Sequence, residues 1–239
     1  MSSLVALVTG ANKGIGLEIA RQLARLQHTV LIGARDPQRG EAAASELRSE
    51  GLDARFVRLD VTDQRDIADA VRMIAATYGR LDVLVNNAAI AQDTAPPSQT
   101  SIDLMRRTYE TNVFGLLAVT QAMLPLLRKA PAARIVNMSS GAGSFARTTS
   151  PTWRVEWATL AYNSSKSAVN AITVQLATEL RDTPIKINAA NPGYTATEMN
   201  QFRGERTVQQ AAIAPVRLAT LPADGPSGGF FEENGIVPW

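Results

Sequence analysis

The chain has 239 residues, of which 45% are hydrophobic and 19% charged, a composition typical of a globular domain and too apolar for a disordered chain. Lys and Arg number 24 against 22 Asp and Glu, and the arginines are scattered, so we expect no nucleic-acid partner. With no cysteine and one histidine, the sequence excludes disulfides, iron–sulfur clusters, cysteine nucleophiles and multi-histidine metal sites. We expect no metal, and chemistry from Ser, Thr, Tyr, Lys, Asn, carboxylates or a bound cofactor.

The N-terminus gives no sign of a targeting segment. Met1-Ser2-Ser3 runs directly into the apolar stretch Leu4–Val8, without the basic segment and long apolar region of a signal peptide. No apolar run approaches the ~20 residues that span a bilayer. We therefore expect a cytoplasmic protein with no membrane partner.

Short β-branched runs alternate with amphipathic helical patterns along the chain. The predicted strands are Leu4–Val8, Thr29–Gly33, Ala54–Leu59, Val83–Asn86, Arg134–Met138 and Ile185–Ala189. The predicted helices are Ile15–Leu26, Arg39–Ser49, Arg65–Thr77, Ile102–Arg128 and Ala161–Leu180. Pro96-Pro97 and Ala223–Gly229 are expected to be surface loops. Because the strands are apolar on both sides, the pattern predicts one doubly wound α/β (Rossmann) domain over residues 1–239, with a mainly parallel sheet and helices on both faces.

In such a sheet, ligands bind beyond the carboxyl ends of the strands. The first strand is followed by Thr9-Gly10-Ala11-Asn12-Lys13-Gly14-Ile15-Gly16, which opens the first helix. Its glycines let the backbone approach a pyrophosphate, and the helix N-terminus offers N–H groups and a positive dipole end. The alternative is a glycine-rich turn without a ligand, which the strand before it and the helix after it disfavour.

The glycine spacing resembles the cofactor motif of the short-chain dehydrogenase/reductase family. Further matching segments follow in the family's order: Leu59-Asp60-Val61, Asn86-Asn87-Ala88-Ala89, Asn112, Ser139-Ser140, Tyr162 with Lys166, and Asn191-Pro192-Gly193. The resemblance runs from about Val5 to Thr197 and implies a nicotinamide-dependent oxidoreductase. Ala89 departs from the family's usual glycine and places a methyl group near the cofactor.

The end of the second strand bears on the choice between NAD and NADP. An acid there binds the ribose 2′-hydroxyl and repels a 2′-phosphate. Ala34 aligns with that acid, Arg35 follows with a fork suited to phosphate, and Lys13 lies in the glycine turn. These residues favour NADP(H), whereas a shift of one residue would make Asp36 the ribose acid and favour NAD.

The resemblance also assigns the adenosine side of the site. It implies that Asp60 and Val61 line the adenine pocket and that Asn87 and Ala88 pass along the ribose. Asp60 equally suits a helix cap, because the sequence Asp-Val-Thr-Asp is also good N-cap sequence.

Tyr162 and Lys166 are four residues apart in a helical pattern, which places them on one helix face. An ammonium one turn away favours the phenolate, so we expect the pKa of Tyr162 to be lowered toward the working pH. Tyr162 could then exchange a proton with a carbonyl oxygen. The resemblance implies that Lys166 also binds the nicotinamide ribose and that Tyr162 contacts the cofactor as well. The alternative is a half-buried helix tyrosine with a solvated lysine as its partner.

Polar residues near the predicted strand ends complete the reacting site. A hydroxyl after the fifth strand can stabilise a developing oxyanion, and the resemblance assigns this role to Ser140, leaving local bonds to Ser139. Asn112 lies in mid-helix, where asparagine is disfavoured. The resemblance implies that it holds a water that links Lys166 to solvent; the alternative is a simple helix kink.

The segment after the sixth strand is expected to face the nicotinamide. Its proline and glycine fix a tight turn, and two threonines follow. The resemblance gives cofactor contacts to Pro192, Gly193, Thr195 and Thr197. His28, which precedes the second strand, is expected to be an exposed loop residue without a role.

Two segments depart from the common family pattern. An insertion loop, 141–161, places 21 residues between Ser140 and Tyr162. It contains the aromatics Phe145, Trp153 and Trp157, which either form the wall of a pocket or pack against local residues. Only 42 residues follow Thr197, so 194–208 is expected to be a short substrate lid. The glycine turn, Ala34–Asp36 and the terminal Gly229–Phe231 resemble the carbonyl-reductase branch, which implies NADPH-dependent reduction of aldehydes and ketones.

The sequence hypothesis is therefore an NADPH-dependent oxidoreductase that reduces carbonyls to alcohols. Tyr162 protonates the oxygen, Ser140 holds it, and Lys166 and Asn112 return the proton. The alternatives are an NAD-dependent alcohol dehydrogenase that works oxidatively and a non-catalytic NAD(P)-binding sensor or scaffold. A small-molecule carbonyl or alcohol is the expected partner, and the sequence leaves open a homodimer, a homotetramer or a monomer.

Overall fold

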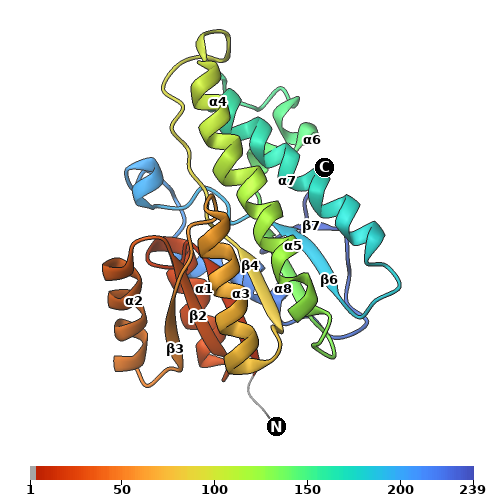
Figure 1. Ribbon diagram of the computed structural model, residues 1–239. Coiled ribbons are helices and arrows are strands. Elements are labelled where there is room, and N and C mark those ends of the chain that lie inside the picture. Colours follow the sequence, from red (N-terminus) through yellow and green to blue (C-terminus); the bar gives the residue numbers. More distant parts are fainter. Residues whose placement is uncertain (1–3) are drawn as a thin grey trace.

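The computed structural model describes residues 4–239 and shows one twisted sheet between two layers of helices (Figure 1). Met1 to Ser3, on which part of the N-terminal expectation rests, lie outside the described residues. The strands are β1 (Val5–Thr9), β2 (Thr29–Ala34), β3 (Ala54–Arg58), β4 (Val83–Asn86), β5 (Arg134–Met138), β6 (Lys186–Ala190), β7 (Phe230–Glu232) and β8 (Gly235–Ile236). Their order is β3-β2-β1-β4-β5-β6-β7-β8, and every neighbouring pair is parallel except β7 with β8.

The helices connect these strands in the manner of a doubly wound fold. They are α1 (Gly14–Arg25), α2 (Pro37–Ser49), α3 (Gln64–Tyr78), α4 (Ile102–Tyr109), α5 (Leu116–Leu127), α6 (Phe145–Thr148), α7 (Leu160–Glu179) and α8 (Val208–Ala219). Short 3-10 turns lie at η1 (Pro97–Gln99), η3 (Gly141–Gly143), η4 (Val155–Trp157) and η5 (Glu198–Asn200). A π-helical segment, η2 (Glu110–Gly115), joins α4 to α5.

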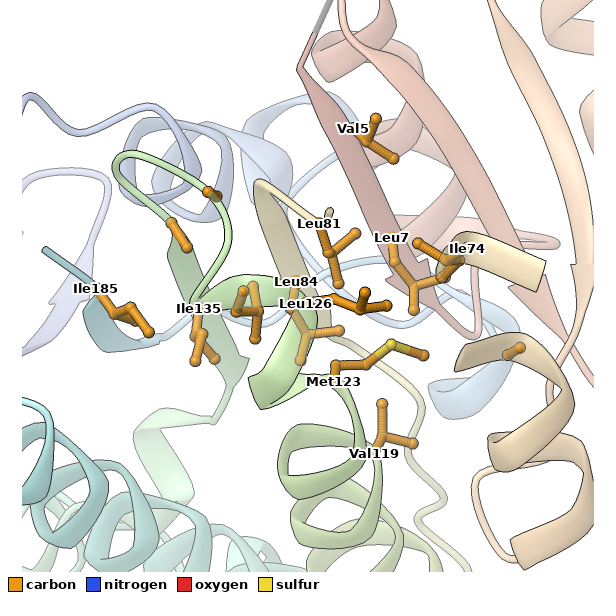
Figure 2. Packing of buried hydrophobic residues seen from close by; sticks show 14 of the residues in the cluster. Val5, Leu7, Ile74, Leu81, Leu84, Val119, Met123, Leu126, Ile135 and Ile185 are labelled. Carbon is orange, nitrogen blue, oxygen red and sulfur yellow. The ribbon is translucent and has the colours of Figure 1, made fainter. Parts of the chain in front are cut away.

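Alternate strand residues enter different hydrophobic layers. Leu7 and Leu84 point to the layer formed with α3, α5 and α7, where Met123 packs against them (Figure 2). Their neighbours Val8 and Val85 point to the opposite layer, formed with α1, α2 and α8. This burial of both sheet faces explains why the strands are almost wholly apolar.

A buried polar chain ties the middle of the sheet to α5 and α7. Asn86 donates from Nδ2 to Thr120 Oγ1 at 2.8 Å and to Asn137 Oδ1 at 2.9 Å, and Asn137 donates to Thr173 Oγ1 at 2.9 Å. Among the described residues Asn86 Oδ1 has no hydrogen-bond partner, but the three bonds of this chain are buried and favour one packing arrangement. The helix that carries Tyr162 and Lys166 is thereby fixed relative to β4 and β5.

The predicted strands and helices are confirmed, and their boundaries differ from those of the structure by at most two residues. The exception is the long helix predicted at Ile102–Arg128, which the π-helical segment η2 divides into α4 and α5. The helices α6 and α8 and the strands β7 and β8 were not predicted. The two strands are very short, and β7 takes its place by pairing Phe230 with Ala189 in β6. Such a short strand depends on its neighbour more than on its own sequence.

The expectation that His28 is exposed is wrong. The residue is only 7% exposed, and its Nδ1 lies 3.1 Å from the carbonyl oxygen of Leu26. The chain reverses tightly through Gln27, which has a φ of 65°, and the backbone N–H of His28 donates to Leu23. This compact turn returns the ring against the fold instead of leaving it in a loop.

Candidate active site

The glycine turn between β1 and α1 lies against the loop that follows β4. Gly10 has a φ of +63°, and a Cβ added there would come within 2.9 Å of the Ala88 Cα. A Cβ on Gly16 would come within 2.4 Å of the Asn87 amide nitrogen, which itself donates to the Thr9 carbonyl at 2.9 Å. Only glycine fits both positions. The two loops form one floor at the N-terminus of α1, an arrangement that suits a pyrophosphate.

A pocket of about 380 Å³ lies at this edge of the sheet. Its lining takes in most of the predicted nucleotide-binding residues: Gly10, Asn12, Lys13, Gly14, Ile15, Gly16, Arg35, Asp60, Val61, Asn87, Ala88 and Thr197. Ala89, which replaces the family's glycine, also contributes to the wall. The predicted contacts Pro192, Gly193, Thr195, Tyr162 and Lys166 are outside that lining, in the elements described below.

The two candidate residues at the end of the second strand have different surroundings in the structure. Asp36 is the N-cap of α2: its Oδ1 accepts from the Arg39 N–H at 3.1 Å, and its Oδ2 lies 3.7 Å from the Arg39 Nε. Arg35 lines the pocket, is exposed, and has no hydrogen-bond or ion-pair partner within residues 4–239. The carboxylate is engaged in capping a helix while the guanidinium is free to meet an anion.

The second predicted cation, Lys13, forms an ion pair with Glu198. The hydrogen bond and charge of Lys13 hold the pKa of the Glu198 carboxyl below its ordinary value. Both side chains are largely exposed, and they join the glycine turn to η5 across the pocket. Sequence analysis did not single out Glu198, although it lies directly after Thr197 in the predicted lid.

Asp60 lines the pocket and is not the N-cap of α3. Asp63 is the N-cap of α3, since its side chain accepts from the Arg65 N–H at 2.8 Å. Asp60 Oδ1 accepts from the N–H and the hydroxyl of Thr62 at 2.9 and 2.8 Å, and the residue lines the pocket beside Val61. This arrangement favours the adenine-side reading over the capping one.

The loop after β5 is fixed directly on α7. Ser139 donates from Oγ to Asn170 Oδ1 at 2.6 Å, which fits its expected local role. A Cβ on Gly143 would come within 2.7 Å of the Lys166 carbonyl carbon, so only glycine permits this contact. Asn170 also donates to the Gly143 carbonyl at 3.0 Å. The loop thereby places Ser140, whose Oγ accepts from the Ala142 N–H at 3.2 Å, beside Tyr162.

Tyr162 and Lys166 lie one above the other on α7, as the sequence predicts. The Lys166 Nζ is 5.6 Å from the centre of the Tyr162 ring and donates to the Met138 carbonyl at 2.7 Å. Lys166 is only 3% exposed, and this burial lowers its pKa to about 8. A lysine with this pKa can gain or lose a proton near neutral pH.

The expected lowering of the Tyr162 pKa is wrong for this structure. Burial raises the pKa of the phenol, and the neighbouring Ser140 side chain opposes the rise without overcoming it. The reason is the cost of placing a phenolate in a desolvated site. Tyr162 is therefore held as a neutral phenol, which is the form that can give a proton to an oxygen.

Asn112 lies in the π-helical segment η2 and makes bonds in two directions. Its Oδ1 accepts from the Ile90 N–H at 2.8 Å, and its Nδ2 donates to the Ile90 carbonyl at 2.9 Å and to Ser165 Oγ at 3.0 Å. The side chain thus connects the loop after β4 to α7, which is more than a simple helix kink provides. Its mid-helix place is explained by the π-helical geometry, which is frequent at functional sites.

The loop after β6 lies beside the Ser140 loop. Asn191 Oδ1 accepts from the N–H groups of Gly141 and Gly193 at 2.9 and 3.1 Å, and its Nδ2 donates to Glu232 at 2.9 Å. Gly193 has a φ of +76°, which suits glycine. Thr195 is buried, and its hydroxyl donates to the Gly193 carbonyl at 3.1 Å. Glu232, in the unpredicted strand β7, was missed because nothing near it in sequence belongs to the site.

Two of the three aromatics of the 141–161 segment contact each other. Trp153 and Trp157 form an edge-to-face pair with ring centres 5.3 Å apart, and Arg154 lies 5.2 Å from the Trp157 ring. Phe145 is 68% exposed, and none of the three aromatics belongs to the lining of the 380 Å³ pocket. Within the described chain, these contacts favour local packing over a pocket wall.

The sequence pattern of the family described as short chain dehydrogenase matches residues 4–207. Carbonyl reductase (NADPH) 1 of Homo sapiens is 35% identical, with 98% of each chain covered. Short-chain dehydrogenase/reductase 1 of Saponaria officinalis is also 35% identical, with 98% of this chain and 95% of that protein covered.

Solved structures agree with the sequence relatives. The NADPH-bound carbonyl reductase from chicken fatty liver superposes with a TM-score of 0.86 at 30% identity, with 100% of both chains covered. Salutaridine reductase of Papaver somniferum gives a TM-score of 0.84 at 28% identity, with 95% of this chain and 99% of that chain covered. The chain belongs to the short-chain dehydrogenase/reductase family, in its carbonyl-reductase-like branch.

Proposed function

We propose that the protein is an NADP(H)-dependent oxidoreductase that reduces the carbonyl group of ketones or aldehydes to an alcohol. The carrying observation is the placement of Tyr162 beside Ser140 and one helical turn from the buried Lys166, whose Nζ lies 5.6 Å from the centre of the phenol ring. Relatives whose names state carbonyl reductase and NADPH support the same chemistry.

NADP(H) is the cofactor. The glycine floor fits a pyrophosphate, and Arg35, which has no partner among the described residues, supplies a cation suited to a 2′-phosphate, whereas Lys13 at the same pocket is paired with Glu198. The engagement of Asp36 in the α2 cap argues against its service as a ribose acid, and so against the NAD-dependent alcohol dehydrogenase. Asp60, Val61, Asn87 and Ala88 would hold the adenosine, and Pro192, Gly193, Thr195 and Thr197 the nicotinamide side.

When bound, NADPH supplies a hydride to the carbonyl carbon, and the proton that completes the alcohol comes from the protein. Tyr162 gives this proton to the carbonyl oxygen, and the Ser140 hydroxyl stabilises the charge that develops on that oxygen. Lys166 lies beside the phenol with a pKa of about 8, and with Asn112 it returns a proton to Tyr162 from solvent. Each reduction consumes one hydride and one proton. After the products are released, the site must therefore be reprotonated before the next turnover.

The partner is a small molecule, and we place the protein in the cytoplasm. The helical run Ile102–Leu127 is long and apolar enough to cross a membrane by composition alone, but half of its most apolar window is buried in the fold. Core helices of soluble proteins meet the same criterion. The 141–161 segment and the 194–208 lid belong to the single domain and flank the substrate's approach.

The test is the oxidation of NADPH, followed by its absorbance, with a panel of aliphatic and aromatic ketones and aldehydes. NADH is run in parallel, and alcohols with NAD⁺ or NADP⁺ test the oxidative direction. We expect carbonyl-dependent oxidation of NADPH that is much faster than that of NADH. Faster alcohol oxidation with NAD⁺ would support the dehydrogenase instead, and cofactor binding without turnover on any substrate would support the sensor or scaffold.

A further inference from the structure

The N-terminus of α7 is capped by a residue from a distant loop. Asp93, in the loop that follows β4, accepts from the backbone N–H of Ala161 at 2.8 Å through Oδ1 and from that of Tyr162 at 3.2 Å through Oδ2. The helix's own N-cap residue, Thr159, makes no side-chain cap bond within the described chain; its hydroxyl donates to Asn163 Oδ1 at 2.7 Å. A carboxylate 68 residues away therefore satisfies two of the helix's first N–H groups.

The carbonyl side of Tyr162 is tied to the same loop. Ser165 donates from Oγ to the Tyr162 carbonyl at 2.7 Å, and Asn112 donates to that Ser165 oxygen at 3.0 Å. Asn112 also holds the N–H and carbonyl of Ile90, three residues before Asp93. The N–H of Tyr162 is thus bonded directly to Asp93, and its carbonyl is connected to Ile90 through Ser165 and Asn112. Both peptide groups that flank Tyr162 are therefore tied to the segment 90–93.

This segment continues from the wall of the nucleotide pocket. Ala88, Ala89 and Ile90 line that pocket, and Asp93 follows after two residues. Asp93 is half-buried, so its bonds to α7 are partly shielded from water. The chain from Ala88 to Asp93 is consequently a short connection between the cofactor wall and the backbone of the proton donor.

We infer that Asp93 is a positioning residue for the proposed reduction: by capping α7 at Ala161 and Tyr162, its carboxylate sets the place of the Tyr162 phenol relative to the cofactor wall. The inference rests on the proposed function for its kinetic part. A small displacement of a reacting group can cost about 100-fold in rate. The carboxylate also opposes the positive dipole end of α7, which strengthens the cap.

The test compares D93A and D93N with a matched control, D63A. Asp63 caps α3 by the same chemistry but is outside the pocket lining and has no hydrogen bond or ion pair with α7 among the described residues. We expect D93A to lower kcat by about 10- to 100-fold while the dissociation constant for NADPH stays unchanged. D93N keeps one acceptor oxygen and should recover part of the lost kcat, because Asn is also a good N-cap. D63A should lower stability without lowering kcat.

A second measurement is independent of turnover. Amide hydrogen exchange at Ala161 and Tyr162 should be faster in D93A than in the wild type, and D93N should be intermediate. If exchange at these two amides is unchanged, or if D93A lowers kcat no more than D63A does, the inference is overturned. A change confined to KM would overturn it as well, since it would indicate that Asp93 contacts the substrate. A wild type without reductase activity would refute the proposed function while the exchange result still decides the capping.

Discussion

Arg35 and Asp36 are adjacent in sequence but have opposite surroundings in the structure. The carboxylate caps α2, whereas the guanidinium is exposed at the wall of the pocket. The sequence alone left both residues as candidates for the ribose, because a shift of one position exchanges their roles. In the structure Asp36 accepts from the Arg39 N–H, whereas Arg35 lines the pocket, and this difference motivates the following prediction.

We predict that R35D weakens NADPH binding far more than NADH binding. The variant removes a cation from the 2′-phosphate and adds a repelling anion, whereas NADH has no phosphate there. A loss of at least about 10-fold in NADPH affinity is expected from the lost charge-assisted hydrogen bonds. Titration with each cofactor, followed by energy transfer from tryptophan to nicotinamide, measures both constants.

The control for this charge change is R107D, an exposed arginine of α4 outside the pocket lining. It carries the same change in net charge and should leave both affinities near those of the wild type. An equal loss of NADPH and NADH affinity in R35D would mean that Arg35 does not face the 2′-phosphate.

The burial of Lys166 predicts a pH dependence of stability. Its pKa in the folded chain is about 8, below the ordinary value of about 10.4, so between these values the unfolded chain holds a proton that the folded chain has released. The free energy of unfolding therefore rises with pH through this window. Denaturant unfolding of the wild type and of K166M at about pH 7 and about pH 10 isolates the effect. The wild type should gain stability relative to K166M at the higher pH; a difference that is constant with pH contradicts the assignment.

At the scale of elements, the residues that carry the site are placed by contacts that local sequence does not encode. The helix α7 was predicted, but its cap comes from Asp93, 68 residues away, which carries no signal of its own in the sequence. The 141–161 segment was recognised as an insertion, yet its conformation depends on residues near the C-terminus. Ser144 Oγ donates to the Pro238 carbonyl at 2.6 Å, and the Ala146 N–H donates to the Trp239 carbonyl at 2.9 Å. Tertiary contacts of this kind can be read only from the fold.

The π-helical segment η2 is packed against the adenine side of the pocket. A Cβ on Gly115 would come within 2.8 Å of Val61 Cγ2 and 2.9 Å of its carbonyl oxygen. We predict that G115A lowers the free energy of unfolding by about 1–3 kcal/mol, because the overpacking outweighs the better helix propensity of alanine, and that it weakens NADPH binding by displacing Val61. Denaturant unfolding and cofactor titration test this. Unchanged stability together with unchanged affinity would show that η2 does not support the pocket.

At the scale of the whole molecule, two hydrophobic layers hold the sheet so that the carboxyl ends of its parallel strands meet at one edge. The alternation of apolar strands and amphipathic helices was enough to predict this architecture, because periodicity and burial depend on many residues at once. The glycine turn and the motifs after each strand were enough to predict which loops meet there. The state of the Tyr162 phenol was not predictable, since its pKa depends on the burial that assembly creates.

The proposed reduction depends on this assembly delivering one proton from Tyr162. The most direct test is a single-turnover measurement of NADPH oxidation with an accepted carbonyl substrate, for the wild type and Y162F. We predict that Y162F binds NADPH as the wild type does but reacts about 100- to 10,000-fold more slowly, because the proton donor is lost. Y78F, at the tyrosine that ends α3 and outside the pocket lining, serves as the control and should react normally. A wild-type rate in Y162F would contradict the assignment of Tyr162 as the proton donor.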